Sequence, residues 1–256
     1  MAAVVHTIDA HADAVIVLRN PSVRFAVWED DEELVPDELV PDELVPNELI
    51  PEELVPEELV PEERGPEEPV PEEPDSEEPA SPSESTNHGK EIHYHVSAKH
   101  LRLASARFES ALSAGNWKEG IPDETDGLYH ISAEDWDESA FLILLNALHL
   151  RTRQIPRTLS LEMLAKIAVL VDYYGCAEAV ELWTEKWIEH LRDSSPIPST
   201  YCRDLILWMC VAWVFRLPNE FAEATAIAMK RSRQEELSTL GLPLSGFVGR
   251  AAQQIG

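Results

Sequence analysis

The N-terminal part of the chain carries three short stretches with the pattern of β-strands. Residues 13–19 are rich in β-branched side chains, and the signal Asn20-Pro21 for a turn follows them. Hydrophobic and polar residues alternate in residues 23–28 and again in residues 91–96. A period of two is typical of strands with one buried face, so we predict three strands here.

From residue 97 onward the hydrophobic spacing becomes helical. Five residues share one face of a predicted helix: Leu101, Ala104, Phe108, Ala111 and Leu112. A short strand is expected at residues 128–132. Further helices are expected at residues 136–148, 161–174, 177–191, 202–216 and from Pro218 onward.

Two of these helices carry additional signals. Ser160 is a favourable N-cap for the helix at residues 161–174, and Gly175 is placed to end it in the left-handed conformation. The helix at residues 202–216 is apolar almost all round, which predicts burial between other helices.

An acidic tract separates the second and third predicted strands. From Glu29 to Glu84 there are 24 acidic residues and one base, Arg64, a net charge of −23 out of −28 for the whole chain. Residues 33–62 repeat the pentad Glu-Leu-Val-Pro-Asp with small variations. Proline every five residues prevents a continuous helix and interrupts strand pairing, so we predict a disordered, low-complexity insert.

Three interpretations of this insert remain open. It is a neutral spacer that grew by duplication, or a multivalent ligand in which each Leu-Val-Pro step is a weak docking site. Alternatively its acids fold back on a basic edge formed by Arg151, Arg153 and Arg157. Those cations also have a local explanation, because positive charge is favoured near a helix C-terminus.

Charge and hydropathy exclude several classes of function. The acidic field repels phosphate backbones and anionic membranes, so no nucleic acid or membrane partner is expected. The longest apolar run, residues 205–215, is shorter than the ~20 residues that cross a bilayer. Residues 1–7 lack the pattern of a secretory signal. Three unpaired cysteines suit reduced thiols, and we expect an intracellular protein, cytoplasmic or nuclear.

The insert is expected to interrupt one domain rather than to link two. Neither flanking part has a complete core alone, and lengthening a connection from ~10 to ~60 residues costs only about 1.5 kcal/mol of closure entropy. We therefore divide the chain into first strands at 1–28, the insert at 29–88, the remainder of the domain at 89–193 and a helical C-terminal extension at 194–256. The fold class is α/β (α+β), a small sheet flanked by a helical cluster.

Several of these segments together resemble BTB/POZ domains. The run from Val96 to Leu112 is similar to the family signature, a strand leading to Leu101, then Ser105, then Phe108. Asp13 ahead of the first strand resembles the family's opening. The helical tail from Tyr201 to Ser232 is most similar to that of fungal BTB-domain proteins. Many animal members have His-Lys before the signature leucine, where this chain has Ser97-Ala98.

The resemblance implies a protein–protein interaction module that forms a homodimer. The family's first strand, here Val15, Ile16 and Val17, is implied in self-association. Some members are adaptors that bridge substrates to the cullin of a ubiquitin ligase, and Trp117-Lys118-Glu119 resembles their cullin-binding step. The implied partner-binding residues are Trp117 and Glu119, although Trp117 also has the alternative of capping the domain's own core. A transcriptional or scaffolding role without a ubiquitin link is the other alternative.

The sequence offers no motif for catalysis. It lacks a nucleophile elbow, a phosphate-binding glycine loop and a Cys-x-x-Cys pair, so we expect no enzymatic activity and no cofactor. His93 and His95 share the polar face of a predicted strand, with His88 and His100 nearby. No carboxylate or cysteine has matching spacing, and we interpret these histidines as exposed or partner-facing rather than as metal ligands. Cys202 and Cys210 are expected to be small core residues.

Overall fold

A four-stranded sheet forms where the predicted strand segments meet. The computed structural model describes residues 4–21, 24–28, 91–113, 117–231 and 238–244. The strands are β1 (Val4–Thr7), β2 (Ala14–Arg19), β3 (Glu91–Val96) and β4 (Tyr129–Glu134), in the order β1-β3-β2-β4. The predicted acidic insert lies outside the described residues.

The pairing of β2 with β3 brings together segments that the insert separates in sequence. The two strands are antiparallel, with Ile16 opposite Tyr94 and Arg19 opposite Glu91. On its other side β2 runs parallel to β4, where Ile16 is opposite Ile131. Side chains of opposed residues point to the same face, so these three form one apolar surface. The predicted third strand is confirmed with its bounds unchanged.

The strand predicted at residues 23–28 is wrong for the part that the structure describes. Residues 24–28 form no strand, and Ala26 has a positive φ of 45° that a strand excludes. Arg203 explains this conformation, because its guanidinium donates to the carbonyl oxygens of Phe25 and Ala26 at 3.1 and 2.8 Å. The fourth strand of the sheet is instead β1, which lies parallel to β3 with Val4 opposite Ile92.

The helix predicted across the signature region is divided into two. Helix α1 (Ala98–Ala104) and helix α2 (Ala106–Ala111) meet at Ser105, whose φ of −142° and ψ of 121° are extended. Ser105 ends α1 and caps α2, since its side chain accepts a hydrogen bond from the Phe108 amide. The predicted apolar face survives this break, because Leu101, Phe108 and Leu112 are all buried.

The next three helices follow the predicted pattern closely. They are α3 (Glu138–Leu148), α4 (Leu161–Tyr174) and α5 (Ala177–Ser194). Ser160 caps α4 by accepting a hydrogen bond from the Met163 amide, and Gly175 ends the helix with φ of 62°. Both predicted signals are confirmed. Each one affects only the backbone of residues close to it in sequence, so the sequence alone is enough to predict it.

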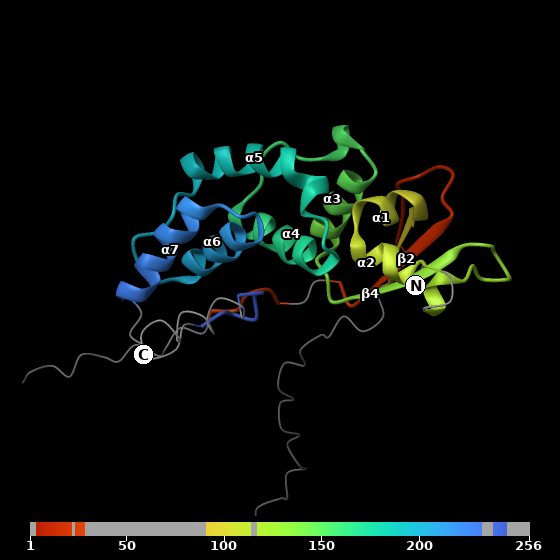
Figure 1. Ribbon diagram of the computed structural model, residues 1–256, viewed down its shortest axis with the longest axis horizontal. Coiled ribbons are helices and arrows are strands. Elements are labelled where there is room, and N and C mark those ends of the chain that lie inside the picture. The colour runs from red at the N-terminus through yellow and green to blue at the C-terminus, as the bar shows by residue number, and fades with distance from the viewer. Residues whose placement is uncertain (1–3, 22–23, 29–90, 114–116, 232–237, 245–256) are drawn as a thin grey trace, which may run out of the picture. The chain divides into compact units, whose positions relative to one another are not determined.

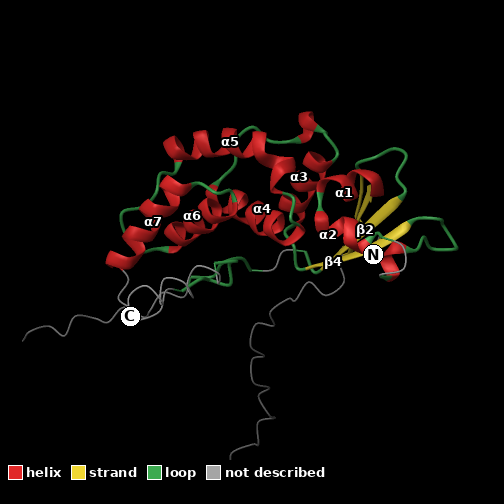
Figure 2. Ribbon diagram, in the orientation of Figure 1, coloured by secondary structure: helices red, strands yellow, loops and turns green. Residues whose placement is uncertain are grey.

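The C-terminal extension adds α6 (Arg203–Val214) and α7 (Pro218–Arg231). Helix α6 is buried on nearly every side and packs along α4, as its all-round apolar sequence predicts. Its buried residues belong to the same core as those of the sheet and of α3 to α5. Figure 1 shows α6 and α7 beside α4, and Figure 2 shows the strands gathered beyond α3.

The fold class is therefore mixed α/β, with a small sheet covered by helices. Two short 3-10 turns complete the described elements, η1 (Lys118–Gly120) and η2 (Thr152–Gln154). Among the described residues no helix combines the length and apolar character that a membrane span requires.

Candidate interaction surfaces

The residues of the predicted signature form one buried junction between the sheet and the helices. A carboxylate oxygen of Asp13, just ahead of β2, accepts a hydrogen bond from the Ala98 amide at 2.6 Å. Leu101 of α1 is fully buried, and Phe108 of α2 is 2% exposed and stacks on Tyr174 at 4.6 Å between ring centroids. These contacts tie the strand, the α1–α2 pair and the end of α4 together.

Ser105 satisfies polar groups on two separate elements. Its hydroxyl accepts a hydrogen bond from the Phe108 amide at 3.1 Å and donates one to the carbonyl oxygen of Tyr174 at 2.5 Å. The side chain is 2% exposed, so water does not replace either partner. Ser105 therefore makes one local hydrogen bond, within α2, and one long-range hydrogen bond, to the end of α4.

The strand predicted to take part in self-association lies in the centre of the sheet. Val15, Ile16 and Val17 belong to β2, which is paired with β3 on one side and with β4 on the other. Val15 and Ile16 are buried and Val17 is half-buried. A partner strand has no free backbone edge to pair with at β2, and the role of these residues in self-association stays a prediction.

Strand β1 is an edge of the sheet and carries exposed apolar side chains. Among the described residues it pairs only with β3, so its outer backbone groups face away from the sheet. Val4 is 36% exposed and Val5 is 53% exposed. An edge of this kind is a template for pairing with another strand unless it is protected.

The turn that contains Trp117 and Glu119 projects an apolar pair into solvent. Trp117 is 62% exposed and Ile121 is 63% exposed, one at each end of η1, while Glu119 is half-buried between them. The Trp117 side chain therefore does not cap the core. Gly120 allows the turn to lie close against the segment that follows α2, because a Cβ atom there would lie 2.6 Å from the carbonyl oxygen of Ser113.

The histidines near β3 are divided between two environments. His93 and His95 are half-buried on the face opposite Ile92 and Tyr94, as alternation predicts. The His93 ring nitrogen lies 3.8 Å from the Glu91 carboxylate. His100 is in α1 with its ring 5.2 Å from that of His149, and His88 lies outside the described residues. No three metal-ligating side chains gather within the part of the chain that the structure describes.

His149 is a buried connection that the sequence analysis missed. Its Nε2 atom accepts a hydrogen bond from the Ser97 amide at 3.0 Å, and its Nδ1 atom donates to the Leu145 carbonyl oxygen at 2.8 Å. Both bonds need the neutral ring. Burial, together with the neighbouring His100, lowers the pKa of His149 and favours that neutral form. The only sequence signal is its position at the C-terminal end of α3.

Two cysteine thiols are held in their neutral form by burial. Burial raises the pKa of Cys176 to about 12 and that of Cys210 to about 12, which leaves neither a reactive thiolate at neutral pH. Cys210 lies in the core, as expected, whereas Cys202 is half-buried at the start of α6.

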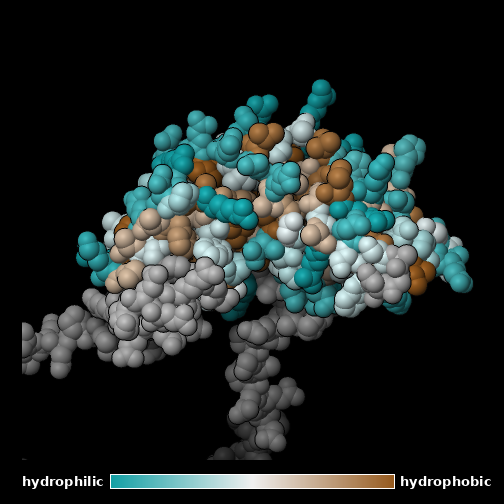
Figure 3. All heavy atoms as spheres, in the orientation of Figure 1, coloured by the Kyte–Doolittle hydropathy of each residue, from teal (hydrophilic) through white to brown (hydrophobic). Residues whose placement is uncertain are grey.

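On the face shown in Figure 3 hydrophilic side chains predominate, and hydrophobic ones appear as small separate patches. Two local surfaces carry exposed apolar side chains, the β1 edge and the Trp117 turn. The chain matches no protein-family model, and no curated protein matches it significantly.

Proposed function

We propose that this chain is a protein–protein interaction module of the BTB/POZ type, which associates with itself and recruits a further protein. The order and pairing of its elements support this reading. The antiparallel pair of β2 and β3 is followed by the α1–α2 helix pair. Strand β4, which is parallel to β2, comes next, and then successive helices. The residues of the family signature, Asp13, Leu101, Ser105 and Phe108, connect these elements.

One observation carries the self-association. Within the part of the chain that the structure describes, the outer edge of strand β1 has no partner strand, and Val4 and Val5 on this strand are exposed. Pairing with β1 of a second copy satisfies the backbone groups of this edge and covers the valines, and the same patch serves both copies of a two-fold dimer.

Light scattering of the purified protein tests this proposal. We expect the mass of a dimer at micromolar concentration, and the same stoichiometry after deletion of residues 33–78. A lysine at the edge, Val5→Lys, opposes pairing and is expected to yield monomers. The matched control is Val27→Lys, at a valine that is 48% exposed but outside the sheet. A wild-type monomer, or equal effects of the two lysines, contradicts the proposal.

The exposed Trp117 favours a second candidate, an adaptor that binds a cullin. A tryptophan that is 62% exposed beside a carboxylate has the features of a binding hot spot with a polar rim. We expect a purified cullin N-terminal region to bind the wild-type chain. The double variant Trp117→Ala with Glu119→Ala should abolish binding while the protein stays folded.

The matched control for this experiment lies on α5. Leu182 is 76% exposed and Glu185 is also exposed, so Leu182→Ala with Glu185→Ala removes an equivalent pair from another face. Calorimetric titration of the three proteins compares them directly. Binding that is unchanged in the first double variant removes Trp117 and Glu119 from the adaptor candidate.

A further inference from the structure

The connection from helix α3 to helix α4 carries three arginines and no acidic residue. Arg151, Arg153 and Arg157 are all exposed, and none of their guanidinium groups makes a hydrogen bond or an ion pair with a residue that the structure describes. Residues 139–161 contain no Asp or Glu, which is the longest such run in a chain with 48 acidic residues. Direct contacts within the described fold therefore leave this positive charge unneutralised.

Helix dipoles explain only part of the charge. Arg151 follows the C-terminus of α3, where positive charge is favoured. Arg157 instead comes shortly before Ser160, the N-cap of α4, where the dipole favours negative charge. The electrostatics of the two helices therefore do not account for Arg157.

Leu150 begins the connection and projects an apolar side chain into solvent. It is 75% exposed and has a φ of 57°, in the left-handed region. Its amide donates to the Ala147 carbonyl oxygen at 3.1 Å, and the Arg151 amide donates to that of Asn146 at 2.8 Å. Helices that end with this pair of bonds favour glycine at the left-handed position, because a Cβ atom is strained there. Leucine therefore adds backbone strain and gains little burial.

Two other helix ends have the same backbone without an exposed apolar side chain. At the end of α4 the left-handed residue is Gly175, with φ of 62°, and at the end of α6 it is Arg216, with φ of 55°. Each of these ends has the matching pair of backbone hydrogen bonds. Glycine relieves the strain, and water solvates the exposed arginine. Of the three residues, Leu150 is the one that the fold does not account for.

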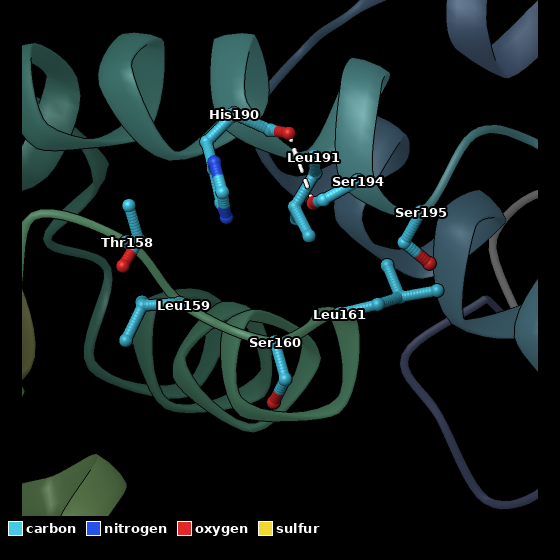
Figure 4. Close-up of a pocket in the computed structure, with 8 residues that line it drawn as sticks. All are labelled: Thr158, Leu159, Ser160, Leu161, His190, Leu191, Ser194 and Ser195. Carbon is cyan, nitrogen blue, oxygen red and sulfur yellow. Dashed lines mark hydrogen bonds between the residues drawn. The ribbon is translucent and has the colours of Figure 1, made fainter.

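The connection is held rigidly against α5. Ile155 is 4% exposed, and the indole Nε1 of the fully buried Trp187 donates to the carbonyl oxygen of Pro156 at 2.8 Å. Figure 4 shows the next part of the segment at Thr158, with the His190 side chain directed toward it from α5. A surface fixed in this way loses little conformational entropy when a ligand binds.

A hollow of about 300 Å³ extends this surface on the side of α5. It is lined by Arg157, Trp183 and Lys186. Lys186 has Glu189 as its i,i+3 neighbour on the same helix, so its charge is partly compensated. The half-buried ring of Trp183 and the guanidinium of Arg157 remain as an apolar wall and a cation of one recess.

We propose that residues 150–157, the arginine connection, dock an acidic segment of another protein in which an apolar side chain lies between carboxylates. Guanidinium groups fit carboxylates because they bind them through two parallel hydrogen bonds. The apolar side chain of the segment covers Leu150 or enters the recess beside Trp183. Neither self-association nor cullin binding is required for this contact.

The charge of the chain favours a protein segment over a nucleic acid as the ligand. Binding to a phosphate backbone commonly involves about 6–10 cationic contacts, and the connection offers three arginines. The net charge of −28 repels a long polyanion. A short acidic segment avoids most of that repulsion, since charges more than about 8 Å away are screened at physiological salt. Leu150 also offers an apolar contact that a phosphate backbone does not use.

Fluorescence anisotropy of a labelled peptide mixed with the full chain tests the proposal. The probe is Glu-Asp-Glu-Leu-Leu-Glu-Asp-Glu. One comparison peptide replaces each acid by its amide, and another replaces both leucines by serine. We expect the probe to bind and each comparison peptide to bind about tenfold more weakly, and about 0.5 M salt should weaken binding of the probe. A short RNA should not displace the probe.

The variant Leu150→Gly separates binding from stability. Glycine relieves the strain of the left-handed backbone, so the melting temperature should stay the same or rise, while affinity for the probe falls about tenfold. A residue with a structural role alone would lower the melting temperature instead. The matched control is Arg216→Gly, at the same backbone conformation, which should leave the affinity unchanged.

A second pair of variants tests the charge. Arg153→Gln should lower affinity for the probe about two- to fivefold, as loss of one exposed ion pair does. The matched control is Arg216→Gln, at an exposed arginine whose side chain has no hydrogen-bond or ion-pair partner among the described residues. Circular dichroism verifies that all variants fold.

The outcomes separate clearly. Binding that is selective for the acidic probe, and is weakened by Leu150→Gly and Arg153→Gln but not by the Arg216 variants, supports the proposal. Absence of binding, equal binding of the amide peptide, or equal effects at Leu150 and Arg216 overturns it. Displacement by the RNA assigns the surface to a nucleic acid, and binding that appears only after deletion of residues 33–78 assigns it to acids of the same chain. Either result also overturns the proposal.

Discussion

The Ser105 junction and the Trp117 turn lie close together in sequence but differ in how deeply their side chains are buried. At the junction, Ser105 and Phe108 are each 2% exposed, and the single hydroxyl of Ser105 makes two hydrogen bonds. At the turn, Trp117 is 62% exposed. The difference teaches that aromatic residues on one short segment occupy opposite environments. Phe108 is buried against Tyr174, whereas Trp117 faces solvent, where we propose that it binds a partner.

The largest expected effect comes from emptying the junction. Phe108→Ala removes a ring that stacks on Tyr174 and leaves a cavity between α2 and α4, so we expect a loss of about 3–5 kcal/mol in the free energy of unfolding. Urea denaturation measures it. Leu103→Ala, at a residue of α1 that is 87% exposed, is the control and should change stability by less than about 0.5 kcal/mol.

Removal of one hydroxyl from the same junction has the next largest effect. Ser105→Ala leaves the Tyr174 carbonyl and the Phe108 amide without their partner in a buried site, which should cost about 1–3 kcal/mol. Ser113→Ala is the comparison, because that hydroxyl also bonds a backbone carbonyl but is exposed. Equal losses of unfolding free energy would mean that burial of Ser105 is not what matters.

We expect acid to lower the free energy of unfolding through protonation of His149. Burial and His100 lower its pKa in the folded state, so below the unfolded pKa of about 6.5 the unfolded chain binds a proton that the folded chain does not. Stability is fully present above that pH and is lost as pH falls toward the folded pKa. Each unit of pKa difference corresponds to about 1.4 kcal/mol.

Measurement of unfolding free energy between pH 7 and pH 5 tests this expectation. His149→Gln removes the titrating ring while an amide oxygen can still accept from Ser97, so the variant should lose less stability over that interval than the wild type. The control is His130→Gln, at an exposed histidine beside Asp126. Parallel pH curves for the wild type and His149→Gln would assign the acid sensitivity to other groups.

The smallest effect on stability is expected at the turn. Trp117→Ala removes a side chain that is mostly in solvent, so the free energy of unfolding should change by less than about 0.5 kcal/mol. Thermal denaturation followed by circular dichroism measures it. A loss above about 2 kcal/mol would contradict the separation of the two regions, because it would give Trp117 a structural role.

How far the sequence predicts the fold depends on how local each signal is. Helix α4 was predicted with its bounds, because Ser160 and Gly175 act on adjacent backbone. The backbone of residues 24–28 was not, since Arg203 imposes it from a position 177 residues away from Ala26. The break at Ser105 was missed for the same reason, because part of its support is the Tyr174 carbonyl.

The candidate surfaces follow the same rule. The sequence drew attention to Trp117 and Glu119, but only the structure gives the exposure of Trp117. The predicted basic edge included Arg157 but not Lys186, because the bond from Trp187 to Pro156 brings them together across the fold. Strand β1 has four residues, too few for a pattern, and its identity depends on its pairing with β3.

The central position of β2 predicts how the protein behaves after proteolytic cleavage. A protease cut between residues 29 and 90 leaves an N-terminal fragment whose strand stays hydrogen-bonded to β3 and to β4 in the larger fragment. The Arg203 guanidinium donates hydrogen bonds to two backbone carbonyl oxygens near the end of the same fragment. The nicked protein should therefore elute as one particle without denaturant, and its halves expressed apart should complement each other.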